Sequence, residues 1–167
     1  ARPGDGLSGA LVRSLAAGRA PGAGWAFEPA APVPALPEGA PAEAAIATDQ
    51  TNESVVVADA VVVKWIRHPV PGGDRADRLL RHLASAGYGG IPPYHGRLAV
   101  DAGGIRLTAA LVSGYLPGAT DGWTWAVDAL LGHLAETGRC RPGCPSGFSR
   151  GLGALAAGLH VALATPS

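Results

Sequence analysis

The 167-residue chain carries thirteen basic and thirteen acidic side chains, so its formal net charge at pH 7 is zero. This length suits one ordinary domain or two small lobes, and the lack of a basic block argues against nucleic acid or an anionic membrane as a partner. No apolar run approaches the ~20 residues that span a bilayer, and the N-terminus lacks the pattern of a signal peptide. We therefore expect a cytoplasmic protein.

The chain contains no methionine. It also stops at residues 164–167, directly after a helical pattern. We therefore expect it to be a fragment, or the ordered part, of something longer.

The first forty-odd residues predict one helix and a loop. Residues 5–18 form an amphipathic helix candidate, in which Leu7, Leu11, Val12 and Leu15 recur at helical spacing. Residues 19–41 are rich in proline, alanine and glycine and are typical of a loop or linker. Within this segment Trp25 and Phe27 are expected to pin a short strand onto the lobe that follows.

A hairpin carrying the only lysine of the chain comes next. After a probable strand at residues 45–47 and a polar turn, two valine-rich runs at 55–57 and 61–66 flank a short Ala-Asp-Ala turn. Lys64 closes the second run. An ammonium among apolar neighbours calls for an anion, although a lysine stem packed along a sheet with its head in water would look the same in sequence.

One helix and two further strands complete the predicted sheet region. Asp74 is a good N-cap for a helix that runs to about Ala86 and stops at Gly87. The leucines expected to face inward are Leu79, Leu80 and Leu83. Asp77 lies about one turn from the helix start and could face back towards the strand of Lys64. Strands at 97–100 and 105–112 flank a hairpin turn at 101–104.

The remainder of the chain reads as helical. Thr120 or Asp121 caps a second helix that starts with Trp123, and a last helix carries Leu152, Leu155, Leu159 and His160 towards its buried side. Cys140 and Cys144 lie in an irregular stretch between these helices. They lack two further ligands for zinc and are expected to be free thiols. The element order predicts an α+β fold: a small antiparallel sheet with one helix, followed by a mainly helical region.

A lysine that closes a Val-rich strand, followed by a helix and a strand pair, resembles the N-lobe of protein kinases. Four stretches extend the resemblance to the bacterial maltokinases and the actinobacterial glucosamine kinases, which share the aminoglycoside-phosphotransferase fold. These stretches are Gln50-Thr51-Asn52-Glu53-Ser54-Val55-Val56, Gly90-Ile91-Pro92-Pro93, Asp121-Gly122-Trp123 and Leu159-His160-Val161-Ala162-Leu163-Ala164. The resemblance covers residues 45–164 in matching order.

The resemblance implies an ATP-dependent sugar kinase, with glucosamine ahead of maltose as acceptor. Residues 1–44 would be the remnant of an N-terminal cap, 45–116 the ATP-binding N-lobe, and 117–167 the start of the helical C-lobe. Lys64 would hold ATP phosphates with Asp77 as its partner, or Asp74 in its place. The covering loop would be Gln50, Thr51, Asn52, Glu53 and Ser54, and the interlobe hinge facing adenine would be Val112, Ser113, Gly114 and Tyr115. Asp121 and Trp123 are candidate sugar contacts, although a helix cap and core packing suit them equally.

The resemblance also has departures. The helix position that carries a glutamate in such kinases falls on Arg78, and no catalytic His-Gly-Asp loop or metal-binding aspartate follows. Phosphoryl transfer needs both a base and Mg²⁺ ligands, so these are expected in a C-lobe beyond this chain. A non-catalytic kinase-like binding module, or another small-molecule phosphotransferase such as one for aminoglycosides, remains an alternative. We expect a monomer or a weak homodimer.

Overall fold

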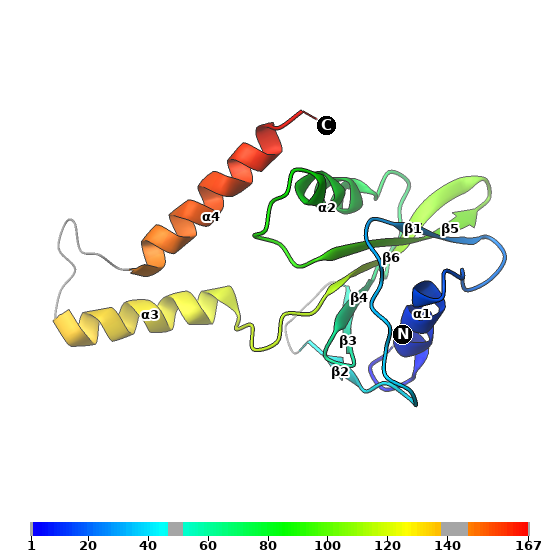
Figure 1. Ribbon diagram of the computed structural model, residues 1–167, viewed down its shortest axis with the longest axis horizontal. Coiled ribbons are helices and arrows are strands. Elements are labelled where there is room, and N and C mark those ends of the chain that lie inside the picture. The colour runs from blue at the N-terminus through cyan, green and yellow to red at the C-terminus, as the bar shows by residue number, and fades with distance from the viewer. Residues whose placement is uncertain (1, 47–51, 138–146, 167) are drawn as a thin grey trace. The chain divides into compact units, whose positions relative to one another are not determined.

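The computed structural model describes residues 2–46, 52–137 and 147–166 (Figure 1). They fall into two units, Ala1–Leu116 and Pro117–Ser167. The elements of the first unit are α1 (Leu7–Ala16), β1 (Trp25–Pro29), β2 (Glu43–Ala45), β3 (Glu53–Val57), β4 (Val61–Trp65), α2 (Arg75–Ser85), β5 (Tyr94–Ala102) and β6 (Ile105–Gly114). Those of the second are α3 (Gly122–Thr137) and α4 (Gly147–Ala164).

The first unit is built on one antiparallel sheet of six strands in the order β1-β5-β6-β4-β3-β2. This confirms the α+β class and the antiparallel sheet that the sequence predicts. The short strand expected at Trp25 and Phe27 is β1, which pairs with β5 at one edge. The strand expected at 45–47 is β2, which begins two residues earlier at Glu43; Ala47 lies outside the described residues.

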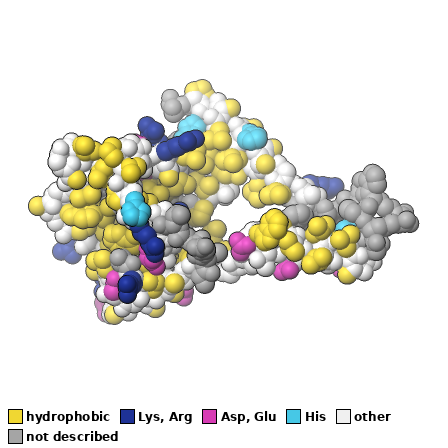
Figure 2. Space-filling view, turned by 180° about the vertical axis from the view of Figure 1, so that it is seen from behind, with side chains coloured by type: hydrophobic (Ala, Val, Ile, Leu, Met, Phe, Trp, Pro, Cys, Tyr) yellow, Lys and Arg dark blue, Asp and Glu magenta, His cyan; other side chains and the backbone are white. Residues whose placement is uncertain are grey.

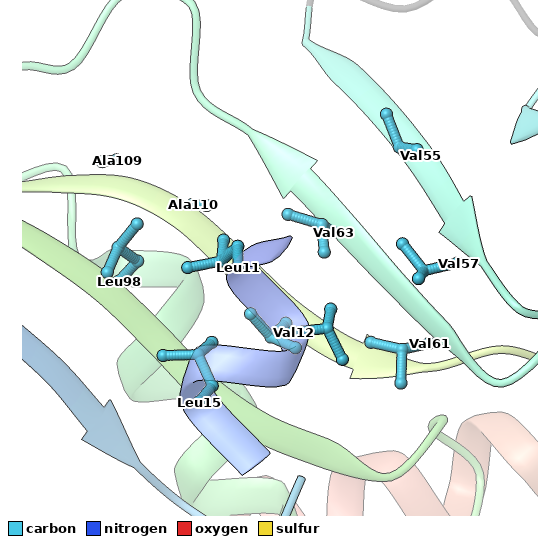
Figure 3. Close-up of a cluster of buried hydrophobic side chains, with 11 residues drawn as sticks. Leu11, Val12, Leu15, Val55, Val57, Val61, Val63, Leu98, Ala109 and Ala110 are labelled. Atoms are coloured by element: carbon cyan, nitrogen blue, oxygen red, sulfur yellow. The ribbon is translucent and has the colours of Figure 1, made fainter. Parts of the chain in front are cut away.

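The hydrophobic core lies between α1 and one face of the sheet (Figure 3). Alternate strand residues point to opposite faces, so every second valine of the β3–β4 hairpin reaches this core. The fully buried valines are Val55, Val57, Val61, Val63 and Val112, and α1 contributes Leu11, Val12 and Leu15.

One of the four residues expected on the inner face of α1 is misplaced. Leu7 is 49% exposed, because the buried stripe is centred on Ser8, Leu11, Val12 and Leu15. At 100° per residue, Leu7 lies roughly 90° from the centre of that stripe.

Both ends of α1 are fixed by hydrogen bonds that backbone N–H groups donate. At its start the Glu43 carboxylate accepts from the N–H groups of Gly4, Gly6 and Gly9 at 2.9, 3.1 and 2.7 Å. Those of Gly6 and Gly9 are at the N-cap and in the first turn, where a helix leaves donors unpaired. At its end Gly18 adopts φ 67°, and the N–H of Arg19 bonds the carbonyl of Ser14 at 2.8 Å. This is a Schellman termination, and it stops the helix two residues before the expected end.

The β3–β4 hairpin turns through two residues in the left-handed region. Ala58 and Asp59 have φ of 52° and 51°, and the N–H of Ala60 bonds the carbonyl of Val57 at 3.1 Å. Two such residues define a type I′ turn, which matches the twist of the strands but strains a residue with a Cβ. The predicted hairpin is therefore confirmed, with strain stored at Ala58.

Helix α2 differs from the prediction in its cap and its buried side. Asp74 precedes the helix but makes no side-chain cap hydrogen bond; its carboxylate lies 3.8 Å from Arg78 instead. Leu83 is buried, whereas Leu79 is 44% exposed. The buried stripe runs through Asp77 and Leu83, and Leu79 lies roughly 100° from its centre at 100° per residue.

The second unit consists of two helices. Asp121 caps α3 by accepting from the N–H groups of Trp123 at 3.1 Å and Thr124 at 3.0 Å, which confirms one of the two predicted caps. The apolar faces expected to be buried are largely open, as the space-filling view illustrates (Figure 2). Leu152 and Leu155 are each 53% exposed, and His160 is exposed rather than inward-facing. Among the described residues, these side chains meet too few packing partners to be covered.

Candidate functional site

Lys64 occupies the last but one position of β4, on the face of the sheet opposite α1. Its neighbour Val63 is fully buried in the α1 core, so Lys64 points to the other face. It lies between Ser54 of β3 and Leu111 of β6. The side chain is exposed, and within the part of the chain that the structure describes it makes no ion pair or side-chain hydrogen bond. The site thus presents an unneutralised ammonium on an open sheet face.

A row of paired residues crosses the sheet from Lys64 to the β1 edge. Lys64 pairs with Leu111, Leu111 with Arg97, and Arg97 with Glu28. With strands about 4.8 Å apart, Arg97 lies roughly 10 Å from Lys64 along this row. Its Nε is 2.8 Å from the Glu28 carboxylate, and its Nη1 donates to Thr108 Oγ1 at 3.3 Å. A second cation of this face is therefore already neutralised.

Asp77 does not pair with Lys64, contrary to the sequence-based expectation. This carboxylate is 4% exposed and is enclosed by three other groups. Tyr94 Oη donates to it at 2.6 Å, Arg81 Nε donates at 2.8 Å, and Arg97 Nε lies at 3.6 Å. Helix α2 packs over β5, so Arg97 reaches the carboxylate first. The alternative partner, Asp74, lies nearest to Arg78.

The cluster of Asp77, Tyr94, Arg81, Arg97 and Glu28, here termed the α2 anchor, ties the helix to the sheet. Arg81 donates from Nη1 to the Pro29 carbonyl at 2.8 Å and from Nη2 to the carbonyl of Glu28. Burial, reinforced by the hydrogen bond to Asp77, raises the pKa of Tyr94 far above its usual value, so the phenol stays a neutral donor. The hydrogen bond from Arg97 lowers the pKa of Glu28, which keeps that carboxylate ionised.

The described part of the predicted covering loop lies beside Lys64. Gln50 and Thr51 fall outside the described residues. Asn52 Oδ1 accepts from the Arg67 N–H at 3.4 Å, and Glu53 forms a 2.8 Å ion pair with Arg67. Glu53 and Ser54 are the first residues of β3 rather than parts of a turn, and Ser54 is the cross-strand neighbour of Lys64.

The predicted hinge comprises the end of β6 and Tyr115, and the backbone donors of its last two residues are already used. The N–H of Gly114 bonds the Pro93 carbonyl at 2.7 Å, and that of Tyr115 bonds the Ala60 carbonyl at 2.8 Å. A Cβ on Gly114 would lie 3.0 Å from Pro93 Cδ, so the close approach of these strands favours glycine. A ligand at this point would meet backbone carbonyls, or groups beyond Tyr115.

Two apolar residues of this face were missed by sequence reasoning. Val56 and Val62 pair with each other, and Val62 pairs with Ser113 of the predicted hinge. Since Val62 lies two residues before Lys64 in the same strand, both side chains point to the same face. This two-residue spacing in the sequence could have identified Val62 as a neighbour of Lys64 on the same face. From Lys64 this face passes Val62 to the end of β6, and Val56 lies on the other side of Val62 on β3.

The remaining candidates lie in the second unit or outside the described residues. Asp121 serves as the α3 cap, and the hydrogen bonds that it accepts from Thr124 lower the pKa of the carboxyl. Trp123 is 79% exposed. Cys140 and Cys144 fall outside the described residues. In the described ranges no three His, Cys, Asp or Glu side chains gather as a metal site would require, and no helix there is long and apolar enough to cross a membrane.

The curated relatives that this chain matches are glucosamine kinases. The chain is 40% identical over 174 aligned positions to a glucosamine kinase of Streptacidiphilus jiangxiensis and 34% identical to one of Mycolicibacterium smegmatis. Each alignment covers 98% of this chain, but only 37% and 40% of those proteins. The chain thus spans about two fifths of the relatives it matches. No family model matches it.

Solved structures give the same correspondence. A glucosamine kinase in complex with glucosamine, ADP and inorganic phosphate superimposes with a TM-score of 0.66 at 34% identity, over 98% of this chain and 37% of that one. A second crystal form of a glucosamine kinase gives 0.66 at 34% identity, over 100% and 39%. The fold of this chain is therefore similar to a part of glucosamine kinase.

Proposed function

We propose that this chain is the nucleotide-binding part of an ATP-dependent glucosamine kinase. The observation that carries the proposal is the 34–40% identity to glucosamine kinases across 98% of the chain, supported by the similarity to a glucosamine kinase bound to glucosamine, ADP and phosphate. In the reaction a glucosamine hydroxyl oxygen attacks the γ-phosphorus of ATP. The bond from that phosphorus to the β–γ bridging oxygen breaks, ADP departs, and the hydroxyl proton passes to a base.

Lys64 is the residue of this chain that we assign to the phosphates. Its ammonium is exposed and has no ion-pair partner in the described structure, so it can neutralise the α- and β-phosphates as charge moves onto ADP. The α2 anchor keeps Asp77 engaged with Arg97 and Arg81. Consequently no helix carboxylate competes with the nucleotide for Lys64. In this proposal α2 is held by Arg81 of the helix and Arg97 of β5, and not by the phosphate-binding lysine.

The same sheet face offers a place for the base of the nucleotide. Val62 is half-buried and lies between Lys64 and the end of β6, with the buried Val56 beside it on β3, and a planar base would bury its face against Val62. Val112, Ser113, Gly114 and Tyr115 would border it as the hinge, through carbonyls because two of their N–H groups are used. The stretch from Gln50 to Ser54 would cover the phosphates.

The rest of the machinery is assigned to the part of the enzyme that this chain does not span. We propose that 1–44, 45–116 and 117–167 are the cap remnant, the ATP-binding lobe and the start of the second lobe. The base and the Mg²⁺ ligands would belong to the remainder, and Mg²⁺ bound there would supply positive charge to offset that of the phosphates. Glucosamine is preferred over maltose as acceptor because the matched relatives are glucosamine kinases, and Asp121 and Trp123 are candidate contacts to it.

The test is the substitution Lys64→Ala in the complete polypeptide, with ADP release measured in the presence of glucosamine. Removal of one pre-placed charge in a site of this kind lowers turnover by about 10²–10³-fold. Stability should stay within about 0.5 kcal/mol of wild type, since an exposed, unpaired side chain is removed. Arg75→Ala, which removes an exposed cation at the start of α2, is the matched control and should leave turnover unchanged. Equal activity of Lys64→Ala and wild type would refute the assignment.

A further inference from the structure

A hollow of about 750 Å³ opens on the opposite face of the sheet from Lys64. It lies between the end of α1, strand β1 and the residues that follow β1. Phe27 pairs with Leu98 of the α1 core, which places the hollow on the α1 side of the sheet. Its principal lining residues are Leu15, Arg19, Trp25, Phe27, Pro32 and Val33. A volume of this size accommodates a small organic molecule.

The walls of the hollow follow from local sequence. The Schellman termination at Gly18 turns the chain out of α1 and fixes the backbone of Arg19 through its bond to Ser14. Trp25 and Phe27 are two residues apart in β1 and point to the same face. Trp25 as a residue remains 36% exposed, so part of its surface faces solvent.

Among the residues that the structure describes, Arg19 is the only charged one that lines this hollow. Its guanidinium forms no ion pair or side-chain hydrogen bond in the described parts of the chain, and no carboxylate lines the cavity. The nearest acidic residue of β1, Glu28, points to the other face and is engaged by Arg97 and Arg106. An unneutralised guanidinium beside aromatic and proline side chains complements an anion carried on an apolar body.

We propose that this hollow is a second binding site, which takes an amphipathic anion: one carboxylate or similar group on a ring-sized apolar body. The guanidinium of Arg19 binds the anionic group, and Trp25 and Phe27 pack against the body. The site lies on the far side of the sheet from Lys64 and does not depend on the nucleotide. A protonated amino sugar is unsuited to it, because its ammonium would face Arg19. The proposal is therefore independent of the proposed kinase activity.

A matched pair of probes tests the charge and the place together. 1-Naphthaleneacetate carries the charge, and 1-naphthaleneacetamide has the same body without it. Titration of each into the isotope-labelled protein, followed by two-dimensional amide NMR, should shift the Trp25 indole N–H and the backbone signals of Gly18 and Arg19. The acid should bind about tenfold more tightly than the amide, as one charge-assisted hydrogen bond provides.

Three variants make the outcome decisive. Arg19→Gln should remove the tenfold preference while leaving the affinity for the amide unchanged. Arg13→Gln, on the exposed side of α1, is the control and should keep the preference. Ala20→Phe, which fills the hollow from its lining, should weaken both probes while leaving the far-ultraviolet circular dichroism unchanged. Equal affinity for acid and amide, binding of neither, or a preference that survives Arg19→Gln would overturn the proposal.

Discussion

The α2 anchor makes a quantitative prediction for the substitution Asp77→Asn. The carboxylate is 4% exposed, and it accepts from Tyr94 at 2.6 Å and from Arg81 at 2.8 Å. An asparagine retains one acceptor oxygen, but its amide nitrogen would face the guanidinium groups as a second donor. Hydrogen bonds to a buried charge contribute about 1.5–3 kcal/mol, and breaking a buried ion pair by removing one partner costs about 3–5 kcal/mol. Since Arg81 is partly exposed, we expect a loss near 3 kcal/mol.

Urea unfolding followed by circular dichroism measures this loss as a fall in the free energy of unfolding. Asp74→Asn is the matched control on the same helix, because its carboxylate is 3.8 Å from an exposed Arg78; such a pair contributes about 0–0.5 kcal/mol. The reasoning is refuted if the two variants lose equal stability, or if Asp77→Asn stays within about 0.5 kcal/mol of wild type. Either result would free Asp77 for the nucleotide role that the sequence suggests.

Three other outcomes follow from local geometry. Ala58→Asn should raise the free energy of unfolding by about 0.5–1 kcal/mol, because asparagine tolerates the left-handed conformation that alanine is forced to adopt; an unchanged or lower melting temperature would contradict this. Gly96→Ala should cost more than about 2 kcal/mol, since φ is 135° and a Cβ would lie 3.0 Å from Pro29 Cα and closer to the Glu28 carbonyl, whereas Gly89→Ala meets open space and should stay within about 0.5 kcal/mol in the same melt. The pKa of Glu28 is lowered from 4.5 by the hydrogen bond from Arg97, so its stabilisation is present above that pH and is lost as pH falls. Glu28→Gln should therefore flatten the fall in stability as the pH drops below about 5, and parallel pH profiles of wild type and variant would exclude the effect.

Features set by neighbours in sequence were predicted, and those set by strand order were not. Alternating valines around a short turn were enough to predict the hairpin and the strand position of Lys64. The prediction that Asp77 pairs with Lys64 was wrong, because it placed Asp77 of α2 towards β4, the strand of Lys64. That choice depends on β5, which pairs with both β1 and β6 and brings Arg97 beneath the helix. No local pattern in the sequence around Arg97 carries that information.

The site shows the same division between local and long-range information. Val62 could have been found by counting two residues back from Lys64, since both share a strand face. The sequence could not show that the N–H groups of Gly114 and Tyr115 are already hydrogen-bonded. Their acceptors are the carbonyls of Pro93 and Ala60, which come from two distant loops. The exposure of Leu7 and Leu79 has a related cause. In each helix a polar residue, Ser8 or Asp77, belongs to the buried stripe. The buried face is therefore not the one on which all the leucines would be buried, and one leucine in each helix is left exposed.

The two edge strands of the sheet, β1 and β2, limit how much of the N-terminal segment can be removed from this protein. β2 has three residues and β1 has five, the last of them a proline, and short or proline-bearing margins resist joining to the sheets of other molecules. Both belong to the segment ahead of residue 46. Removing that segment to isolate the lysine-bearing lobe would bare the nine-residue β5 on one side and the valine run of β3 on the other. A shortened protein of that kind would be prone to self-association through its open strands. The N-terminal segment therefore protects both edges of the sheet from pairing with other molecules, in addition to any binding role.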